Sequence, residues 1–117
     1  MSRATAKGTR FESQVADYMR SRLHMPIERR AKCGFKDKGD LAGVRIGGFD
    51  AVIECKNHKN MALPKWLEEA EAEKVNAEAS FGIVVHKRRG CGEKSMGDTY
   101  VTMTLDTLCD IAEAVKR

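Results

Sequence analysis

The sequence lacks the features that mark membrane, secreted and multidomain proteins. No apolar stretch approaches the roughly 20 residues that a helix needs to cross a bilayer, so we expect no membrane anchor. The basic N-terminal segment, residues 1–10, is not followed by an apolar run, so we expect no secretory signal. Linkers, repeats and low-complexity segments are also missing. These absences predict a single domain over residues 1–117, located in the cytoplasm.

Cysteine is scarce and scattered. The four cysteines are Cys33, Cys55, Cys91 and Cys109, and they form neither a CxxC pair nor a cluster with histidine. This spacing argues against a structural zinc site. Cys55 and Cys109 lie within apolar patterns, so we expect their reduced thiols to fill the core.

Positive charge is present in excess and is unevenly distributed. The net charge is +4, and residues 1–38 hold ten lysines and arginines against four acidic residues. Such asymmetry favours a polyanionic partner, most simply nucleic acid, although a solvated basic face remains the alternative for each side chain. The predicted phosphate contacts are Lys7, Arg10, Arg29, Arg30, Lys32, Lys36, Lys38 and Lys59. Arg88 and Arg89 rank below them.

Hydrophobic periodicity predicts an α/β fold with a mixed central sheet flanked by helices. Gly47 and Gly48 separate two β-rich runs and predict a hairpin. The continuous apolar run 81–87 is typical of a central strand covered on both faces. The expected elements are a helix (10–24), an edge strand (27–32), the hairpin (41–55), a helix (64–79), two strands (81–87 and 99–105) and a C-terminal helix (105–115).

All three predicted helices have apolar stripes that indicate which side faces the core, and on the helix at 10–24 the stripe consists of Phe11, Val15, Tyr18, Met19 and Leu23. On the helix at 64–79 the stripe consists of Leu63, Leu67, Ala70, Lys74 and Ala77, with Trp66 beside it. Its acidic residues, Glu68, Glu69, Glu71 and Glu73, are expected in solvent. On the C-terminal helix the stripe consists of Leu105, Leu108, Cys109, Ala112 and Val115.

Three charged residues lie at the ends of the predicted hairpin strands. Glu54 and Lys56 are two positions apart in an extended segment, so their side chains share one face. The hairpin can bring Asp40 close to Glu54, and two adjacent carboxylates repel unless a positive group lies between them. Oxygen ligands of this kind favour Mg²⁺ or Mn²⁺, and the backbone carbonyl of Cys55 is a further candidate ligand.

Lys56 adds a cation to this predicted metal site. It can orient or deprotonate a water molecule, or it can stabilise charge on an attacked phosphate. Metal, hydroxide and lysine together suit phosphodiester hydrolysis. The simpler interpretation is that Asp40 caps a turn and that Glu54 and Lys56 form an ion pair at the end of a strand. His58 follows this stretch and is a weaker candidate for phosphate contact.

These residues resemble the motif of the PD-(D/E)XK nuclease superfamily. Asp40, in the dipeptide GD, stands where that family has its aspartate, and the tripeptide ECK at 54–56 matches the (D/E)XK element. Gly39 replaces the family's proline. The resemblance implies a restriction-endonuclease-like core and a divalent metal held by Asp40, Glu54 and the Cys55 carbonyl, with Lys56 catalytic.

A narrower resemblance links the chain to Holliday junction resolvases of the archaeal and phage type. The segment KGTRFE, residues 7–12, is similar to the stretch that opens the first helix of those enzymes. The resemblance implies that Glu12 is a further acidic catalytic residue, although a solvated glutamate is ordinary at this position. It also implies a homodimer, because cutting a four-way junction requires two active sites. A phage protein acting inside its host cell fits this interpretation.

The sequence therefore predicts a metal-dependent endonuclease acting on branched or duplex DNA, with a Holliday junction resolvase as the leading hypothesis. Another PD-(D/E)XK nuclease, directed at flaps, ends or foreign DNA, is the nearest alternative. A non-catalytic DNA-binding module would use the same basic surface. An RNA-directed nuclease is a third possibility, because contacts to the 2′-hydroxyl cannot be identified from sequence.

Overall fold

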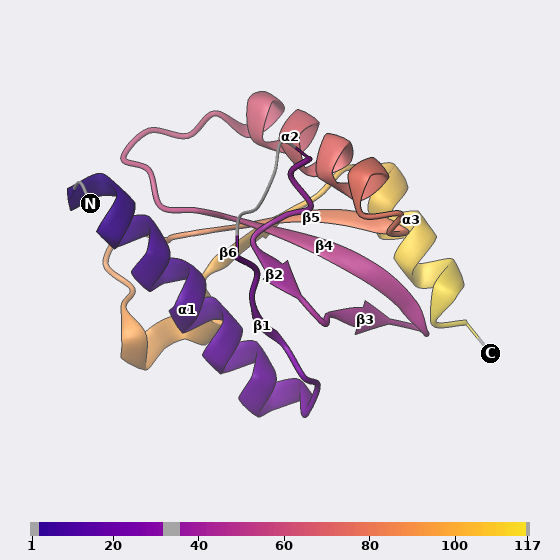
Figure 1. The fold of residues 1–117 in the computed structure, drawn as a ribbon, viewed down its shortest axis with the longest axis horizontal. Coiled ribbons are helices and arrows are strands. Elements are labelled where there is room, and N and C mark those ends of the chain that lie inside the picture. Colours follow the sequence, from indigo (N-terminus) through magenta and orange to yellow (C-terminus); the bar gives the residue numbers. More distant parts are fainter. Residues whose placement is uncertain (1–2, 32–35, 117) are drawn as a thin grey trace.

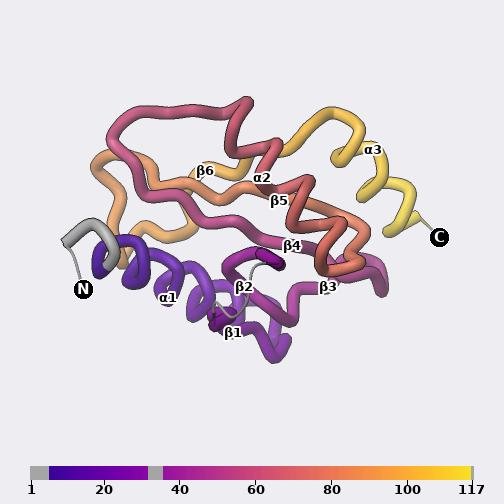
Figure 2. The backbone as a smooth tube through the Cα atoms, turned by 45° about the horizontal axis from the view of Figure 1, so that its top comes forward, coloured from indigo at the N-terminus to yellow at the C-terminus, as the bar shows by residue number. Residues whose placement is uncertain are grey.

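The protein is a central sheet between layers of helices (Figures 1 and 2). The computed structural model describes residues 3–31 and 36–116. No helix in this described part is long and apolar enough to span a membrane. The helices are α1 (Arg3–Leu23), α2 (Leu63–Asn76) and α3 (Leu105–Ala114), with the 3₁₀ helix η1 (Glu93–Asp98). The strands are β1 (Glu28–Arg29), β2 (Leu41–Ala42), β3 (Arg45–Ile46), β4 (Phe49–Lys56), β5 (Phe81–His86) and β6 (Tyr100–Thr102).

The sheet is mixed, as the sequence predicts. Among the described residues its strands follow the order β1-β2-β4-β5-β6, and β3 pairs separately with β4. β4 and β5 are parallel, with Glu54 opposite Val84, whereas the other pairs are antiparallel. β5 is buried along its whole length, which confirms the central strand predicted from the run at 81–87. β1 is an edge strand, also as expected.

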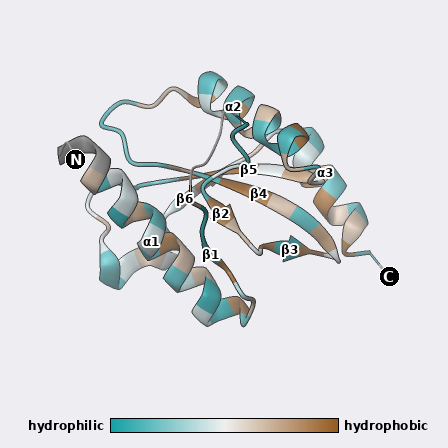
Figure 3. Ribbon diagram, in the orientation of Figure 1, coloured by the Kyte–Doolittle hydropathy of each residue, from teal (hydrophilic) through white to brown (hydrophobic). Residues whose placement is uncertain are grey.

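The two faces of β4 serve different purposes. Ala51, Ile53 and Cys55 point into the larger hydrophobic cluster, which α1 completes with Phe11 and Val15. Residues at alternate positions along a strand face the opposite side. Glu54 and Lys56 therefore face α2, which packs Trp66 and Ala70 against Val84 of β5. In Figure 3 the strands in the middle of the molecule carry much of the hydrophobic colour, while the outer turns of the helices are largely hydrophilic.

Two glycines with positive φ determine the backbone conformation on either side of Asp40 and β2. Gly39, directly before Asp40, has φ +95°, and a Cβ atom there would lie 2.6 Å from Cγ1 of Val52. Proline cannot adopt this φ, so glycine replaces the family's proline for a conformational reason. Gly43 also has a positive φ and lies against the backbone of Pro26, and the predicted strand 41–46 is divided there into β2 and β3.

The sequence predicted where the helices lie along the chain better than which face of each helix is buried. α3 packs Ile111 and Ala114 against the larger cluster, while Leu105 and Leu108 are 75% and 52% exposed. Cys109 is also exposed, so the prediction that it fills the core is wrong, whereas Cys55 is buried as predicted. α1 begins at Arg3, seven residues before the predicted start, because the apolar stripe marks only the part of the helix that the core covers.

Candidate active site

The backbone holds Asp40 firmly beside β4. Its N–H donates to the carbonyl of Ile53 at 2.9 Å, and its own carbonyl accepts from the N–H of Arg30 at 2.7 Å. Its Oδ2 accepts a hydrogen bond from the N–H of Cys55 at 2.7 Å, and the residue is buried. The sequence prediction that Asp40 lies close to the end of the strand carrying Glu54 therefore matches the geometry.

Cys55 presents its backbone, not its thiol, to this site. The thiol lies in the larger hydrophobic cluster. Burial raises the pKa of this thiol well above its usual range, and the nearby carboxylates of Asp40, Glu12, Glu54 and Glu73 add to the effect. Because N–H and C=O of one residue leave a strand on the same edge, the carbonyl of Cys55 also faces the side where Asp40 lies.

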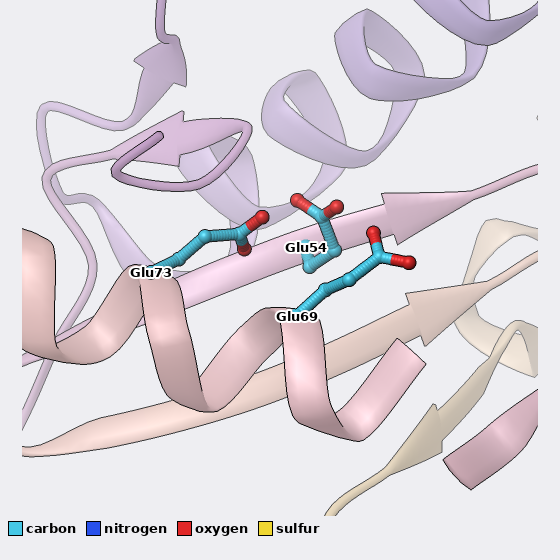
Figure 4. A group of neighbouring side chains, drawn as sticks. All are labelled: Glu54, Glu69 and Glu73. Carbon is cyan, nitrogen blue, oxygen red and sulfur yellow. The ribbon is translucent and has the colours of Figure 1, made fainter. Parts of the chain in front are cut away.

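α2 contributes two further carboxylates, although its sequence pattern predicts that they lie in solvent. Glu54 extends from β4 toward Glu69 and Glu73, which project from successive turns of α2 (Figure 4). One carboxylate oxygen from each of the three lies within 4.8 Å of the others. Glu73 is only 3% exposed, so its predicted solvation is wrong, and Glu69 is half-buried. The signal for this face is Trp66, Ala70 and Glu73, which have the helical spacing i, i+4, i+7.

Burial and mutual repulsion make Glu54 and Glu73 reluctant to ionise. Burial and the neighbouring Asp40 raise the pKa of Glu54 to about 8. Burial and the neighbouring Glu54 raise the pKa of Glu73 to about 10. One buried oxygen of each, Oε1, has no hydrogen-bond partner among the described residues. An unsatisfied buried oxygen is costly, and a cation with several open coordination positions is the group that such oxygens can ligate.

Lys56 is the cation built into the cluster. Its Nζ lies 3.2 Å from Oε2 of Glu54 and 2.7 Å from Oε2 of Glu69. Burial alone would lower the pKa of Lys56, but the carboxylates of Glu69 and Glu54 raise it above its usual value. Lys56 is therefore charged at neutral pH, which suits a group that stabilises negative charge better than one that abstracts a proton.

A cavity of about 600 Å³ opens over these groups. We call it the carboxylate cavity; its charged lining residues are Lys7, Glu12, Arg29, Asp40, Glu54, Lys56 and Lys59. The four residues predicted to be catalytic, Glu12, Asp40, Glu54 and Lys56, thus share one cavity. Glu12 comes from α1 and lies 3.8 Å from Nη1 of Arg29 on β1. The site accordingly draws charge from both helical layers and from the sheet between them.

The predicted phosphate-binding residues divide into two groups. Lys7, Arg29 and Lys59 line the carboxylate cavity, and each of them is exposed. The others lie beyond its lining: Arg10, Lys36 and Lys38 are exposed, and Arg30 is half-buried. Lys32 lies outside the described residues. A strand of nucleic acid that enters the cavity would thus meet positive charge from α1, from β1 and from the segment after β4.

The comparisons with known proteins agree with this geometry. Residues 3–116 match the family described as "Phage putative PDDEXK endonuclease". Searches of curated proteins and of solved structures returned no match. The family match covers nearly the whole chain, and Asp40, Glu54 and Lys56 lie within the matched residues. The fold is thus the α/β restriction-endonuclease-like fold, and the chain belongs to this family of phage PDDEXK endonucleases.

Proposed function

We propose that this endonuclease hydrolyses DNA phosphodiester bonds with the help of Mg²⁺ or Mn²⁺. The observation that carries the proposal is the pair of buried oxygens on Glu54 and Glu73 that have no hydrogen-bond partner among the described residues, with Glu54 beside Asp40 in the lining of an open cavity. Without a cation, Glu54 and Glu73 stay together in the folded protein only by holding protons, as their raised pKa values indicate. The arrangement instead suits a divalent cation.

The residues that would hold the metal form an oxygen-rich set around Glu54. Asp40 and the carbonyl of Cys55 lie on one side, and Glu73 and Glu69 lie on the other. Such hard oxygen ligands suit Mg²⁺ and Mn²⁺. When bound, the metal supplies an acidified water and partial neutralisation of charge on the phosphate.

The protein groups around the metal have separate roles in the proposed reaction. Lys56, held by Glu54 and Glu69, stabilises the negative charge that develops on the attacked phosphate. Glu12, at the opposite wall, positions Arg29 through their ion pair. Lys7 and Lys59 hold flanking phosphates, and these contacts contribute affinity without sequence preference.

We further propose that the enzyme acts on branched DNA as a homodimer, with a Holliday junction as the leading substrate. The segment KGTRFE supports the branched-DNA substrate, since it resembles the stretch that opens the first helix of Holliday junction resolvases. Exposed apolar side chains support the homodimer. These are Val101 of β6 and Leu105, Leu108 and Val115 at α3, and each of them is more than half exposed. Apolar residues that gather at the surface favour an interface with another chain.

A panel of DNA substrates tests the proposed specificity. Wild-type protein with Mg²⁺ or Mn²⁺ should cut a four-way junction symmetrically and faster than linear duplex, and light scattering should give twice the mass of one chain. Faster cutting of flapped or single-stranded DNA would replace the junction with the alternative nuclease substrates. A protein that binds every DNA and cuts none would be a binding module.

A further inference from the structure

A second cavity, of about 500 Å³, adjoins the carboxylate cavity. The two share a wall made by Lys7 and by residues 56–59. The second cavity continues past Trp66 of α2 to the end of β5 and to Tyr100 on β6. Its volume lies within the range of about 300–1,000 Å³ that is usual for small-molecule sites. A strand whose phosphate lies over Glu54 can therefore continue directly into this space.

The charges of the second cavity have one sign. None of the described residues that line it is acidic, whereas three acidic residues line the carboxylate cavity. In the part of the chain that the structure describes, Lys7, Lys59 and Arg89 make no ion pair with an acid. We call it the cationic cavity; its positive residues are Lys7, Lys56, Lys59, Lys87, Arg88 and Arg89. Such uncompensated positive charge fits a polyanion.

The same cavity carries a row of aromatic rings. Trp66 lies between His58 and His86, with ring centroids 5.7 Å and 5.4 Å away. Tyr100 follows at 5.4 Å from His86, and the guanidinium of Arg88 lies 5.3 Å from the centroid of the Tyr100 ring.

The two middle rings of this row are buried, and the two outer rings are exposed. Trp66 and His86 are buried, and Nε2 of His86 lies 2.8 Å from Oγ1 of Thr102, so His86 has a hydrogen-bond partner within the fold. His58 and Tyr100 are exposed. The rigid middle therefore supports two accessible aromatic surfaces.

We propose that the cationic cavity binds one unpaired nucleotide of the substrate strand, next to the phosphate that is cut. This inference rests on the proposed endonuclease function and specifies its substrate. Lysine and arginine hold the backbone phosphate, while Tyr100 and Arg88 stack against the base. A base inside a duplex has both faces covered by its neighbours, so only an unpaired base can use this surface.

The proposal changes which DNA the enzyme should prefer. A fully paired four-way junction offers no free base unless its centre opens, whereas a flap, a gap or a frayed end offers one at once. The cationic cavity thus favours DNA with an unpaired nucleotide beside the cutting point. Any base can stack on an aromatic ring, so the subsite should tolerate all four nucleotides.

The test measures binding to a duplex that carries one unpaired 2-aminopurine, compared with the fully paired duplex. All proteins carry Glu54→Gln to prevent cutting. The parent should bind the unpaired DNA about tenfold more tightly, the scale of one base–aromatic stack, and should change the 2-aminopurine fluorescence. Tyr100→Ala should abolish both effects, and Tyr100→Phe should retain them because the ring remains.

Two control variants match the substitutions at Tyr100 and Arg89. Phe49→Ala removes another half-exposed aromatic, at the opposite end of the sheet, and Lys94→Ala removes an exposed cation of η1. Both should leave the preference intact, whereas Arg89→Ala should reduce it. Equal affinity of the parent for both DNAs would overturn the proposal, and so would an equal loss on both DNAs in Tyr100→Ala. Failure of the wild type to cut any DNA would overturn the endonuclease function instead, and the binding comparison would still decide the subsite.

Discussion

The carboxylate cavity and the cationic cavity share a wall but differ in charge and burial. The first is lined by the buried carboxylates of Asp40 and Glu54, and Lys56 lies beside Glu54. The second has no acid among the described residues of its lining and ends at exposed rings, including Tyr100. Buried carboxylates that repel one another are expected where chemistry needs a metal, and exposed cations where a substrate must be held. We therefore assign the cutting of DNA to the carboxylate cavity and the binding of DNA to the cationic cavity, and this separation can be tested by substitution.

The largest effect should come from the carboxylates that flank Cys55. Asp40→Asn and Glu54→Gln should each reduce the cleavage rate by about 10³-fold, because each removes charge from the proposed metal site. Their affinity for DNA should stay near that of the wild type or increase, since the repulsion between carboxylate and phosphate decreases. Initial cleavage rates and fluorescence anisotropy measure the two quantities. A parallel loss of binding and cutting would break the separation.

Substitution of Glu73 should reduce the cleavage rate less than substitution of Asp40 or Glu54, because it should act by weakening the binding of the metal. Glu73→Gln keeps the shape of the side chain and should weaken Mn²⁺ binding by about 10- to 100-fold, as is usual for groups that support a metal site. The cleavage rate should recover at high Mn²⁺ concentration. Glu71→Gln is the matched control, because Glu71 lies on the same helix and pairs with Lys74 at 2.8 Å. Metal titrations that do not distinguish the two variants would remove Glu73 from the site.

Substitutions in the wall that the two cavities share should weaken DNA binding and leave the cleavage rate nearly unchanged. Lys7→Ala and Lys59→Ala should each reduce the slope of log Kd against log salt concentration by about 1, the effect of one lost phosphate contact. The rate at saturating DNA should change little. Lys94→Ala serves again as the surface control, with an unchanged slope. Slopes that match the control for both lysines would argue against phosphate contacts at this wall.

The smallest effect concerns stability without metal. The raised pKa values of Glu54, about 8, and Glu73, about 10, mean that the folded protein binds protons that the unfolded chain releases above pH 4.5. The free energy of unfolding should therefore fall as pH rises from about 4.5 toward 8 in EDTA. Glu73→Gln should reduce this fall and raise the melting temperature at pH 8 by about 4 °C. Added Mg²⁺ should stabilise the wild type more at pH 8 than at pH 5. A melting temperature that increases with pH in EDTA would contradict the assigned shifts.

The hairpin half of the site could be predicted because its geometry is local. Glu54 and Lys56 share a face through strand alternation alone, and Asp40 needs only the returning strand to reach them. Gly39 shows the limit of motif comparison. Its departure from the family pattern is explained by its positive φ and by the closeness of Val52, which leaves no room for a Cβ atom.

The helical half could not be predicted because it depends on how α2 rotates about its axis. The apolar stripe through Leu67 and Ala70 put Glu73 in solvent, whereas the helix buries Trp66, Ala70 and Glu73. A buried glutamate breaks the hydrophobic pattern, and only the site it faces explains it. The cationic cavity was missed for another reason: its walls come from distant segments, so no sequence spacing joins Lys7 to Tyr100.

The metal dependence of cutting by the wild-type protein tests the central claim most directly. A labelled DNA that contains a four-way junction and a flap should be incubated with EDTA, with Mg²⁺ and with Mn²⁺. We predict cutting at defined positions in Mg²⁺ or Mn²⁺ and none in EDTA, because in the proposed mechanism Glu54 and its neighbours act through a bound cation. Intact DNA in both metals, or equal cutting in EDTA, would contradict the account.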